Sequence, residues 1–474
     1  MNDIVIIGAG IIGTMLAREL SFYHLNTVVL ERNSDVAEGT TMANSAIVHT
    51  GYDPEDGTLK ARLNVEGARM YPRLLEQLHC HSTNTGAFIA ACGKQEEEHL
   101  NVLMQRADQR GIPYRILDRD QALKEEPCLS DGVTKVIDFH TTCVIYPWEV
   151  ALRCMENAVN NGVELHLNTE VKDIEKTEDG YRVICDREIF ETKMVINCAG
   201  VNAGKIHDMI DAHRDYEITP RKGEYYVLDH NVQPVQHIIF PVPGPQGKGV
   251  LAVPTVYGNT LIGPNAALCE ADDVSTSMEG LQYVRSAISK TLKNIPLQDN
   301  IRTFAGIRAT SSRHDFIIEE VAGAKGFIDV AGIESPGLAS APAIVKKIVD
   351  ELVIPYMHPS LNTQASYTVG APVIIHEMNE EMQNQMIRNN PLYGKIVCRC
   401  EKISEQEIID CLKRPVPPTS IDGIRKRVRP GMGRCQGGFC QPHVLRILAE
   451  NAGISKTDVC LKGPGSNILV KENR

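Results

Sequence analysis

The sequence predicts an α/β protein, in which a Rossmann-like N-terminal domain is accompanied by an antiparallel α+β domain and a small helical C-terminal module. Three observations lead to this prediction: a strand–turn–helix–strand unit in residues 4–31, alternating apolar and polar stretches over residues 163–197 and 223–262, and two close pairs of cysteines in residues 398–440. A chain of 474 residues is long enough for two or three domains.

The N-terminal unit carries the glycine pattern of a dinucleotide-binding site. A buried strand, Ile4 to Ile7, leads into Gly8, Gly10 and Gly13 and a periodic helix, and a second strand ends at Glu31. These glycines allow a tight turn and a close approach of a pyrophosphate to the helix N-terminus. An acid at the end of the second strand accepts ribose hydroxyls, so we count Glu31 and the adjoining Arg32 as cofactor-binding residues.

Small and hydroxylated residues follow this unit. In the segment GTTMANSAIVHTG, hydroxyl groups are placed to line the cofactor, and we select Thr40, Thr41 and Ser45. His49 ends the segment and is a candidate acid–base group, because imidazoles titrate near neutral pH.

The middle of the chain alternates between helices and strands. We expect helices at residues 59–79, 96–110, 147–161 and 277–292, a β-meander over 163–197, and an antiparallel domain over 215–330. The stretch 326–352 then repeats the strand, small-residue turn and helix of the N-terminus, which directs a second helix N-terminus at the site.

Composition excludes several functional classes. The formal charge of −11 argues against nucleic-acid binding, which requires a cationic surface. No apolar run is long enough to cross a membrane, and the first strand begins without a signal peptide, so we expect a cytoplasmic protein.

Four of the fourteen cysteines form a metal-binding pattern. Cys398 and Cys400 are followed, thirty-four residues later, by Cys435 and Cys440. Paired thiolates bind zinc or iron–sulfur clusters, and the tight C-x-C spacing favours iron–sulfur. Cys411 lies outside both pairs and is expected to be a bystander. Basic residues at 399, 425–427, 429 and 434 would offset the cluster charge or dock a partner, unless they are an ordinary solvated face.

These motifs resemble two known families. Residues 1–350 resemble the FAD-dependent D-amino-acid-oxidase-like superfamily. The matching features are the glycine pattern with Glu31 and the segments TTMANSAIVHTG, VINCAG, FAGIRA and AGIESPGLASAPA. Residues 396–441 resemble the bacterioferritin-associated-ferredoxin-like [2Fe–2S] domain. Together they resemble the A subunits of anaerobic glycerol-3-phosphate dehydrogenases. The resemblance implies FAD bound by the N-terminal unit, with further contacts from Val171, Gly200, Gly332, Gly337 and Leu338.

The domain boundaries follow from the motifs and the resemblance. FAD-binding segments are expected at about residues 1–58, 147–214 and 326–352, and substrate-domain segments at 59–146 and 215–325. A linker covers 353–395, the [2Fe–2S] domain 396–445, and a tail 446–474.

The resemblance also implies an activity: oxidation of sn-glycerol 3-phosphate by hydride transfer to flavin N5. His49 would take the hydroxyl proton, and Arg308 and Arg313 would hold the anionic end of a small substrate. Arg221 or Lys222, from the segment PRKGEYY, is a further candidate for the anionic end. Electrons would pass through the cluster to a protein subunit or a quinone, with any membrane association made through partners.

Two alternatives stay open. The residues after His49 are closer to the L-2-hydroxyglutarate oxidases, so a 2-hydroxy-acid or amino-acid dehydrogenase is the first. A non-catalytic flavin and iron–sulfur electron carrier is the second.

Overall fold

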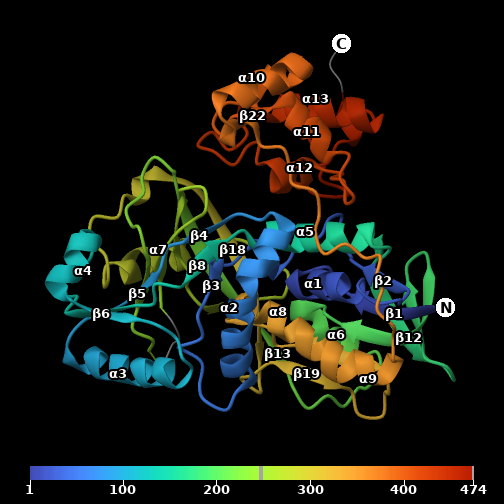
Figure 1. Ribbon diagram of the computed structural model, residues 1–474, viewed down its shortest axis with the longest axis horizontal. Coiled ribbons are helices and arrows are strands. Elements are labelled where there is room, and N and C mark those ends of the chain that lie inside the picture. Colours follow the sequence, from blue (N-terminus) through green and yellow to red (C-terminus); the bar gives the residue numbers. More distant parts are fainter. Residues whose placement is uncertain (245–248, 472–474) are drawn as a thin grey trace.

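The computed structural model describes residues 1–244 and 249–471, and Figure 1 shows a large body with a smaller C-terminal module above it. The large body is built on two extended sheets. We call residues 375–471 the C-terminal module.

The first sheet is centred on β1, which pairs in parallel with both β2 and β12. Ile4, Val5 and Ile6 of β1 are fully buried, as a strand covered on both faces must be. β9 and β20 continue this parallel core, and β19 pairs antiparallel with β20. β10 and β11 extend β12 as an antiparallel meander. The strands are β1 (Asn2–Ile7), β2 (Thr27–Leu30), β9 (Glu164–His166), β10 (Val171–Lys176), β11 (Tyr181–Cys185), β12 (Ile189–Asn197), β19 (Ile317–Glu320) and β20 (Phe327–Ala331).

Helices bring the cofactor-binding elements together. The helix α1 packs against α5 and α8, and α2 crosses α8. These helices are α1 (Ile11–Leu20), α2 (Leu59–Leu78), α5 (Pro147–Asn160), α6 (Ala203–His207) and α8 (Gly337–Ile348), which continues as a π-helical turn (Val349–Val353) into α9 (Ile354–Met357). The two strand–turn–helix units therefore direct their helix N-termini toward the same region of the body.

The second sheet differs in one respect from the antiparallel domain that the sequence predicts. Most of its pairs are antiparallel, but β14 pairs in parallel with β5 and so joins the two sequence segments into one sheet. Its strands are β5 (Ala87–Ala91), β6 (Arg115–Asp118), β7 (Lys135–Asp138), β13 (Ile218–Leu228), β14 (Ile238–Pro241), β15 (Leu251–Pro254), β16 (Thr260–Gly263), β17 (Ala267–Leu268) and β18 (Asn300–Ser311).

Smaller elements complete the large body. The helices α3 (Lys94–Gln109), α4 (Arg119–Glu125) and α7 (Met278–Ile288) accompany the second sheet, and β3 (Ile47–Val48), β4 (Ser82–Asn84) and β8 (Cys143–Ile145) form a small sheet.

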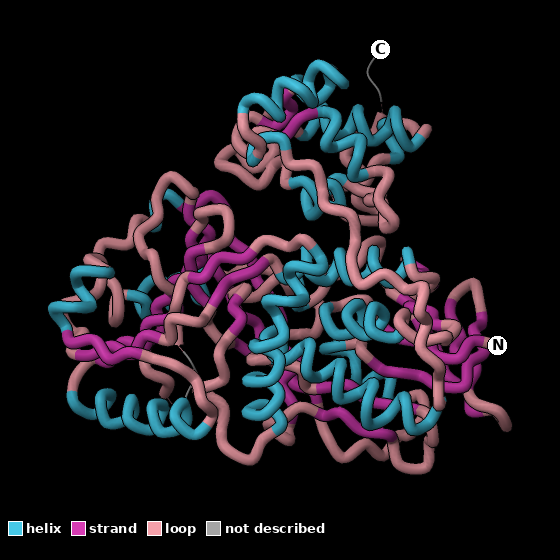
Figure 2. The backbone as a smooth tube through the Cα atoms, viewed as in Figure 1, coloured by secondary structure: helices cyan, strands magenta, loops and turns pink. Residues whose placement is uncertain are grey.

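The C-terminal module consists of short helices around a two-stranded sheet. It contains α10 (Glu380–Asn389), β21 (Ile396–Cys398), β22 (Ile403–Ser404), α11 (Glu405–Cys411), α12 (Ile421–Val428) and α13 (Gln441–Ala452). A loop, residues 358–374, runs up the large body into the module (Figure 2). Asn157 and Arg153 of α5 hold this loop by hydrogen bonds to the carbonyls of Ser366 and Gly370, at 2.9 and 2.5 Å.

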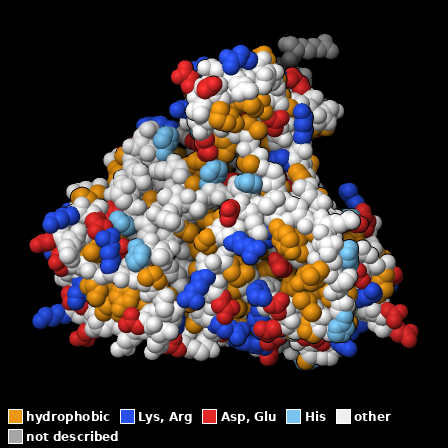
Figure 3. All heavy atoms as spheres, in the orientation of Figure 1, with side chains coloured by type: hydrophobic (Ala, Val, Ile, Leu, Met, Phe, Trp, Pro, Cys, Tyr) orange, Lys and Arg blue, Asp and Glu red, His pale blue; other side chains and the backbone are white. Residues whose placement is uncertain are grey.

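Charges of both signs are interspersed on the face that Figure 3 shows. Within the part of the chain that the structure describes, no helix is both long and apolar enough to cross a membrane.

Candidate active site

A cavity of about 1660 Å³ lies where the two sheets meet, and most of the predicted site residues line it. One end is formed by the β1–α1 turn and the end of β2, and the other by β13, β18 and the N-terminus of α8. The predicted residues on its wall are Gly8, Gly10, Glu31, Arg32, Thr40, Thr41, Ser45, His49, Val171, Gly200, Arg308, Gly337 and Leu338.

The glycine turn is shaped for a phosphate group. Gly8 has φ of +103°, and a Cβ there would lie 2.6 Å from the carbonyl oxygen of Cys198. A Cβ on Gly13 would lie 2.0 Å from the carbonyl oxygen of Gly8, so this glycine allows α1 to pack on the turn without itself lining the cavity. Gly10, the N-cap of α1, has no side chain, and the first helical N–H, that of Ile11, donates to the Thr41 Oγ1 at 2.9 Å. The helix N-terminus therefore presents backbone N–H groups and partial positive charge to the cavity, which fits a pyrophosphate.

The acid at the end of β2 is held in a fixed orientation. Its Oε2 accepts a hydrogen bond from the Ala9 N–H at 2.8 Å, and its Oε1 accepts one from the Asn33 N–H at 2.9 Å. Burial raises the pKa of Glu31, while these two backbone donors lower it. The carboxylate is thus fixed on the wall at the adenosine end, where it can accept further hydrogen bonds from ribose hydroxyls.

Two arginines face each other at the other end of the cavity. Arg221 on β13 and Arg308 on β18 are directly paired in the antiparallel register, and both line the cavity. Neither forms an ion pair with a carboxylate of residues 1–244 or 249–471. The Arg308 Nη2 donates to the Asn265 carbonyl at 3.2 Å. The hydroxyl of Tyr225, which also lies on this wall, is 3.0 Å from the Ser45 Oγ.

His49 lies on the same cavity wall, in an aromatic environment. The imidazole is buried and its ring centroid lies 5.5 Å from that of Phe240 and 6.4 Å from that of Tyr52. The Asn64 side chain donates to the His49 carbonyl at 2.9 Å and fixes the backbone at this position. This end of the cavity therefore combines the His49 imidazole with the guanidinium groups of Arg221 and Arg308.

The N-terminus of α8 adds partial positive charge to the cavity through Gly337 and Leu338. Gly332, in contrast, does not line the cavity. It has φ of +65°, and a Cβ there would lie 2.7 Å from the Cβ of Ser311, so its place is in the turn behind the wall.

The structure does not bring Arg313 to the cavity, contrary to the prediction. Arg313 lies in the turn after β18, where its guanidinium is paired with Glu319 at 2.9 Å and with Asp215. Its neighbour His314 lines the cavity instead. Arg221 therefore takes the place that the sequence interpretation gave to Arg313.

The four predicted cysteine ligands come together as two pairs. The Sγ atoms of Cys400 and Cys435 are 3.8 Å apart, and Cys398 is hydrogen-bonded to Cys440. This hydrogen bond lowers the pKa of Cys398 and raises that of Cys440, so within this pair it favours the thiolate at Cys398. Two pairs of thiolates fit the two irons of a [2Fe–2S] cluster. In the described part of the chain, no group of three or more His, Cys, Asp or Glu side chains is placed to hold a single metal ion.

Cys411 is buried in α11, where its Sγ lies 3.1 Å from the Ile408 carbonyl, apart from both pairs.

Two residues of the basic run, Lys426 and Arg427, are not solvated but dock the C-terminal module on the large body of the same chain. Arg427 forms a two-pronged ion pair with Asp35 at 2.8 and 3.0 Å, and Lys426 reaches Asp35 and Glu38 at 2.9 and 2.5 Å. Burial alone would raise the pKa of Asp35, but the two cations lower it to about 2. Because Glu38 lines the cavity, the module is tied to the loop that covers the cofactor site.

Sequence reasoning missed several of these residues. The docking acids Asp35 and Glu38 carry no local signal, because their basic partners lie nearly 390 residues away. Asn265 and Tyr225 were also missed; a possible signal for Asn265 is its position directly after Gly263-Pro264, where a strand ends.

Comparisons with known proteins agree with this geometry. Residues 3–351 match the FAD-dependent oxidoreductase family (DAO), and residues 396–450 match the BFD-like [2Fe-2S] binding domain. The chain belongs to the FAD-dependent oxidoreductase family and carries a C-terminal [2Fe–2S] domain. Its cofactors are FAD and a [2Fe–2S] cluster.

Several individual relatives within this family are dehydrogenases or oxidases of small hydroxylated substrates by name. The chain is 43% identical over 474 residues to a glycerol 3-phosphate dehydrogenase of Caloramator mitchellensis, covering 99% of this chain and 98% of the relative. It is 28% identical to the human mitochondrial L-2-hydroxyglutarate dehydrogenase, covering 74% and 88%. Among solved structures, it is similar to the FAD-bound L-alpha-glycerophosphate oxidase of Mycoplasma pneumoniae, with a TM-score of 0.75, 28% identity and coverage of 79% and 99%.

Proposed function

We propose that this protein oxidises sn-glycerol 3-phosphate to dihydroxyacetone phosphate. The observation that carries the proposal is the facing pair of Arg221 and Arg308 on the cavity wall. Like charges directly opposite on neighbouring strands destabilise a sheet unless an anion lies between them. A phosphate dianion offsets two positive charges, and its oxygens match the geometry of guanidinium donors.

The remaining residues of the cavity have distinct tasks in this reaction. When bound, FAD supplies the acceptor for the hydride that leaves the alcohol carbon. The N-terminus of α1 and Glu31 hold the cofactor at the adenosine end. Arg221 and Arg308 bind the phosphate and so orient the carbon that is oxidised. The His49 imidazole accepts the hydroxyl proton, directly or through water.

The whole-chain relative supports this substrate, since its name is glycerol 3-phosphate dehydrogenase and it aligns over 98% of its length. The alternative substrate class is a 2-hydroxy acid, whose carboxylates would use the same two arginines. A pure electron carrier would leave His49 and both arginines without a task, and the enzyme family to which the chain belongs argues against it.

We further propose that the electrons leave through the [2Fe–2S] cluster to a partner protein or a quinone. The buried ion pairs of Arg427 and Lys426 support this, because they dock the cluster-bearing module on the flavin-bearing body of the same chain. A flavin collects two electrons at once, whereas this cluster passes them singly.

The decisive experiment is an anaerobic titration of the purified holoenzyme followed by visible absorbance. We expect sn-glycerol 3-phosphate to bleach the flavin band at once, and L-2-hydroxyglutarate to leave it unchanged. The variant His49→Gln should bleach more slowly and lose the pH dependence of the rate near neutrality. Bleaching by L-2-hydroxyglutarate alone would refute the phosphate assignment, and bleaching by neither would refute both.

A further inference from the structure

The four cluster ligands are not equally buried. Cys398 and Cys440 are 1% and 2% exposed, whereas Cys400 and Cys435 are only partly buried. Since Cys400 and Cys435 form one close pair, one half of the cluster site lies nearer to solvent than the other. Electrons leave a cluster most readily on its less buried side, because the path to a partner is shorter there.

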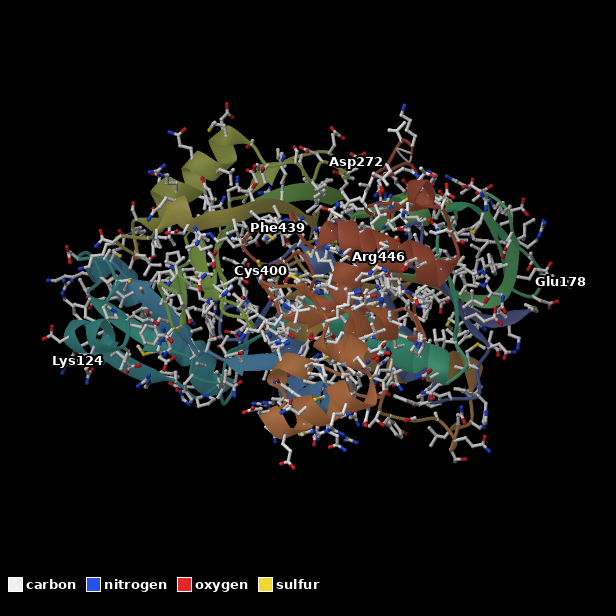
Figure 4. The ribbon with its side chains drawn as sticks, turned by 90° about the horizontal axis from the view of Figure 1, so that it is seen from above. Lys124, Glu178, Asp272, Cys400, Phe439 and Arg446 are labelled. Carbon is white, nitrogen blue, oxygen red and sulfur yellow. The ribbon has the colours of Figure 1, made fainter. Side chains whose placement is uncertain are left out.

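An apolar side chain stands beside this half of the cluster. Phe439 is 81% exposed and directly precedes the ligand Cys440. The Phe439 N–H is hydrogen-bonded to the ligand Cys435, whose Sγ lies 3.8 Å from that of Cys400, and Figure 4 labels Phe439 and Cys400 on the same side of the C-terminal module. An exposed aromatic ring is an unfavourable feature on a free surface and is a common anchor in an interface.

Exposed cations lie in the same two chain segments as the cluster ligands. Arg399 and Lys402 are exposed, within two residues of a ligand, and neither has a carboxylate partner in the described residues. Arg434 is also exposed and lies 3.7 Å from Asp229. Glu401, the one acid among residues 399–402, is already paired with Arg429 at 2.8 Å. The chain as a whole carries −11, so this surface is a positive patch on an acidic protein.

We propose that an acidic one-electron carrier protein docks on this surface, formed by Arg399, Lys402, Arg434 and Phe439, and receives the electrons there. We call it the exit surface. The inference rests on the proposed function, because it needs a substrate that reduces the cluster. Complementary charge steers such a partner to the cluster, and the rest of the acidic chain repels it from other faces.

The electron balance requires two carriers for each turnover. Oxidation of one secondary alcohol to a ketone releases two electrons and two protons. Each of two carrier molecules takes one electron from the cluster, and the two protons pass to water.

The test compares two haem proteins as acceptors for the holoenzyme with sn-glycerol 3-phosphate. The soluble domain of cytochrome b5 is the acidic probe, and cytochrome c is the basic probe. We expect reduction of cytochrome b5 to slow at least fivefold between about 10 and 300 mM salt, since screening weakens steering. Equal or faster reduction of cytochrome c, or a rate that does not depend on salt, would overturn the proposal.

Variants locate the surface. The double variant Arg399→Gln/Lys402→Gln should reduce cytochrome b5 about tenfold more slowly at low salt, with the difference disappearing at high salt. Phe439→Ser should slow it at every salt concentration. The control Lys124→Gln removes an exposed cation at the far edge of the molecule and should have no effect (Figure 4). Loss of rate in this control as large as in the double variant would refute the location.

Two further measurements separate the possible failures. If sn-glycerol 3-phosphate does not bleach the flavin of the wild-type holoenzyme, the proposed function is contradicted and not the exit surface. Each variant must keep the flavin bleaching and the iron content of the wild type, so that a slower rate with cytochrome b5 reports the exit surface. Flotation with phosphatidylserine vesicles tests a membrane instead. The proposal of a protein partner would be overturned if the wild type bound these vesicles, the double variant did not, and the wild type showed no preference for cytochrome b5 over cytochrome c.

Discussion

Replacing the facing arginines is the sharpest perturbation of the substrate site. In Arg308→Gln the phosphate loses one charge-assisted hydrogen bond, which contributes about 1.5–3 kcal/mol. At about 1.4 kcal/mol for each factor of ten, kcat/KM for sn-glycerol 3-phosphate should fall roughly 10- to 150-fold. Arg221→Gln should behave similarly, and the double variant should lose less than the product of the two because both guanidinium groups share one phosphate.

The assay is anaerobic steady-state dye reduction with two substrates. Glycerol lacks the phosphate, so its slow oxidation should be unchanged in the variants, and the ratio of the two kcat/KM values isolates the phosphate contacts. Arg308→Lys should give an intermediate loss, since lysine keeps the charge without the forked donors. Arg313→Gln is the matched control and should match the wild type, because Arg313 is paired with Glu319 outside the cavity. An equal fall for glycerol and for sn-glycerol 3-phosphate would show that the arginines support the fold and not the phosphate.

Three further predictions concern the cofactors and the docking contact. Asp35→Asn leaves buried Arg427 without its counter-charge, which costs about 3–5 kcal/mol, and should expose the C-terminal module to limited proteolysis. Because the folded pKa of Asp35 is lowered to about 2, its stabilising effect is complete above about pH 4 and is lost only as the pH falls toward 2, so proteolysis of the wild type should not increase between pH 8 and 5. Gly10→Ala puts a methyl group at the phosphate end of the cavity without crowding the protein, so the variant should fold and retain little FAD by absorbance at 450 nm. Cys435→Ser should lose iron and the brown absorbance, whereas Cys411→Ala should keep both; equal iron contents would refute the ligand assignment.

Local signals made the cofactor sites predictable. Gly8, Gly10, Gly13 and Glu31 lie within one βαβ unit, where the chemistry follows from spacing alone, and the structure places three of them on the cavity wall. The four cysteine ligands were predictable in the same way, because the short spacing within each pair is itself typical of metal ligands.

The substrate end depended on pairing that no local pattern contains. Arg221 and Arg308 are brought together by the register of two strands far apart in the sequence. The family resemblance assigned Arg313 to the substrate, but β18 ends at Ser311 and Arg313 lies in the turn that follows, where it pairs with Glu319. The basic run near Arg427 was ambiguous because its partner Asp35 lies in the first domain.

Removing the C-terminal module would leave buried charges on the large body without their partners. Glu156 of α5 is fully buried and accepts hydrogen bonds from Arg414 at 2.6 and 2.8 Å, with Arg153 at 2.9 Å. A protein shortened to its flavin-binding portion would leave Asp35 and Glu156 as carboxylates that have lost cations contributed by the missing piece. Any attempt to express that portion by itself should therefore begin by replacing Asp35 with a neutral residue, whereas Glu156 should be kept as the counter-charge of buried Arg153.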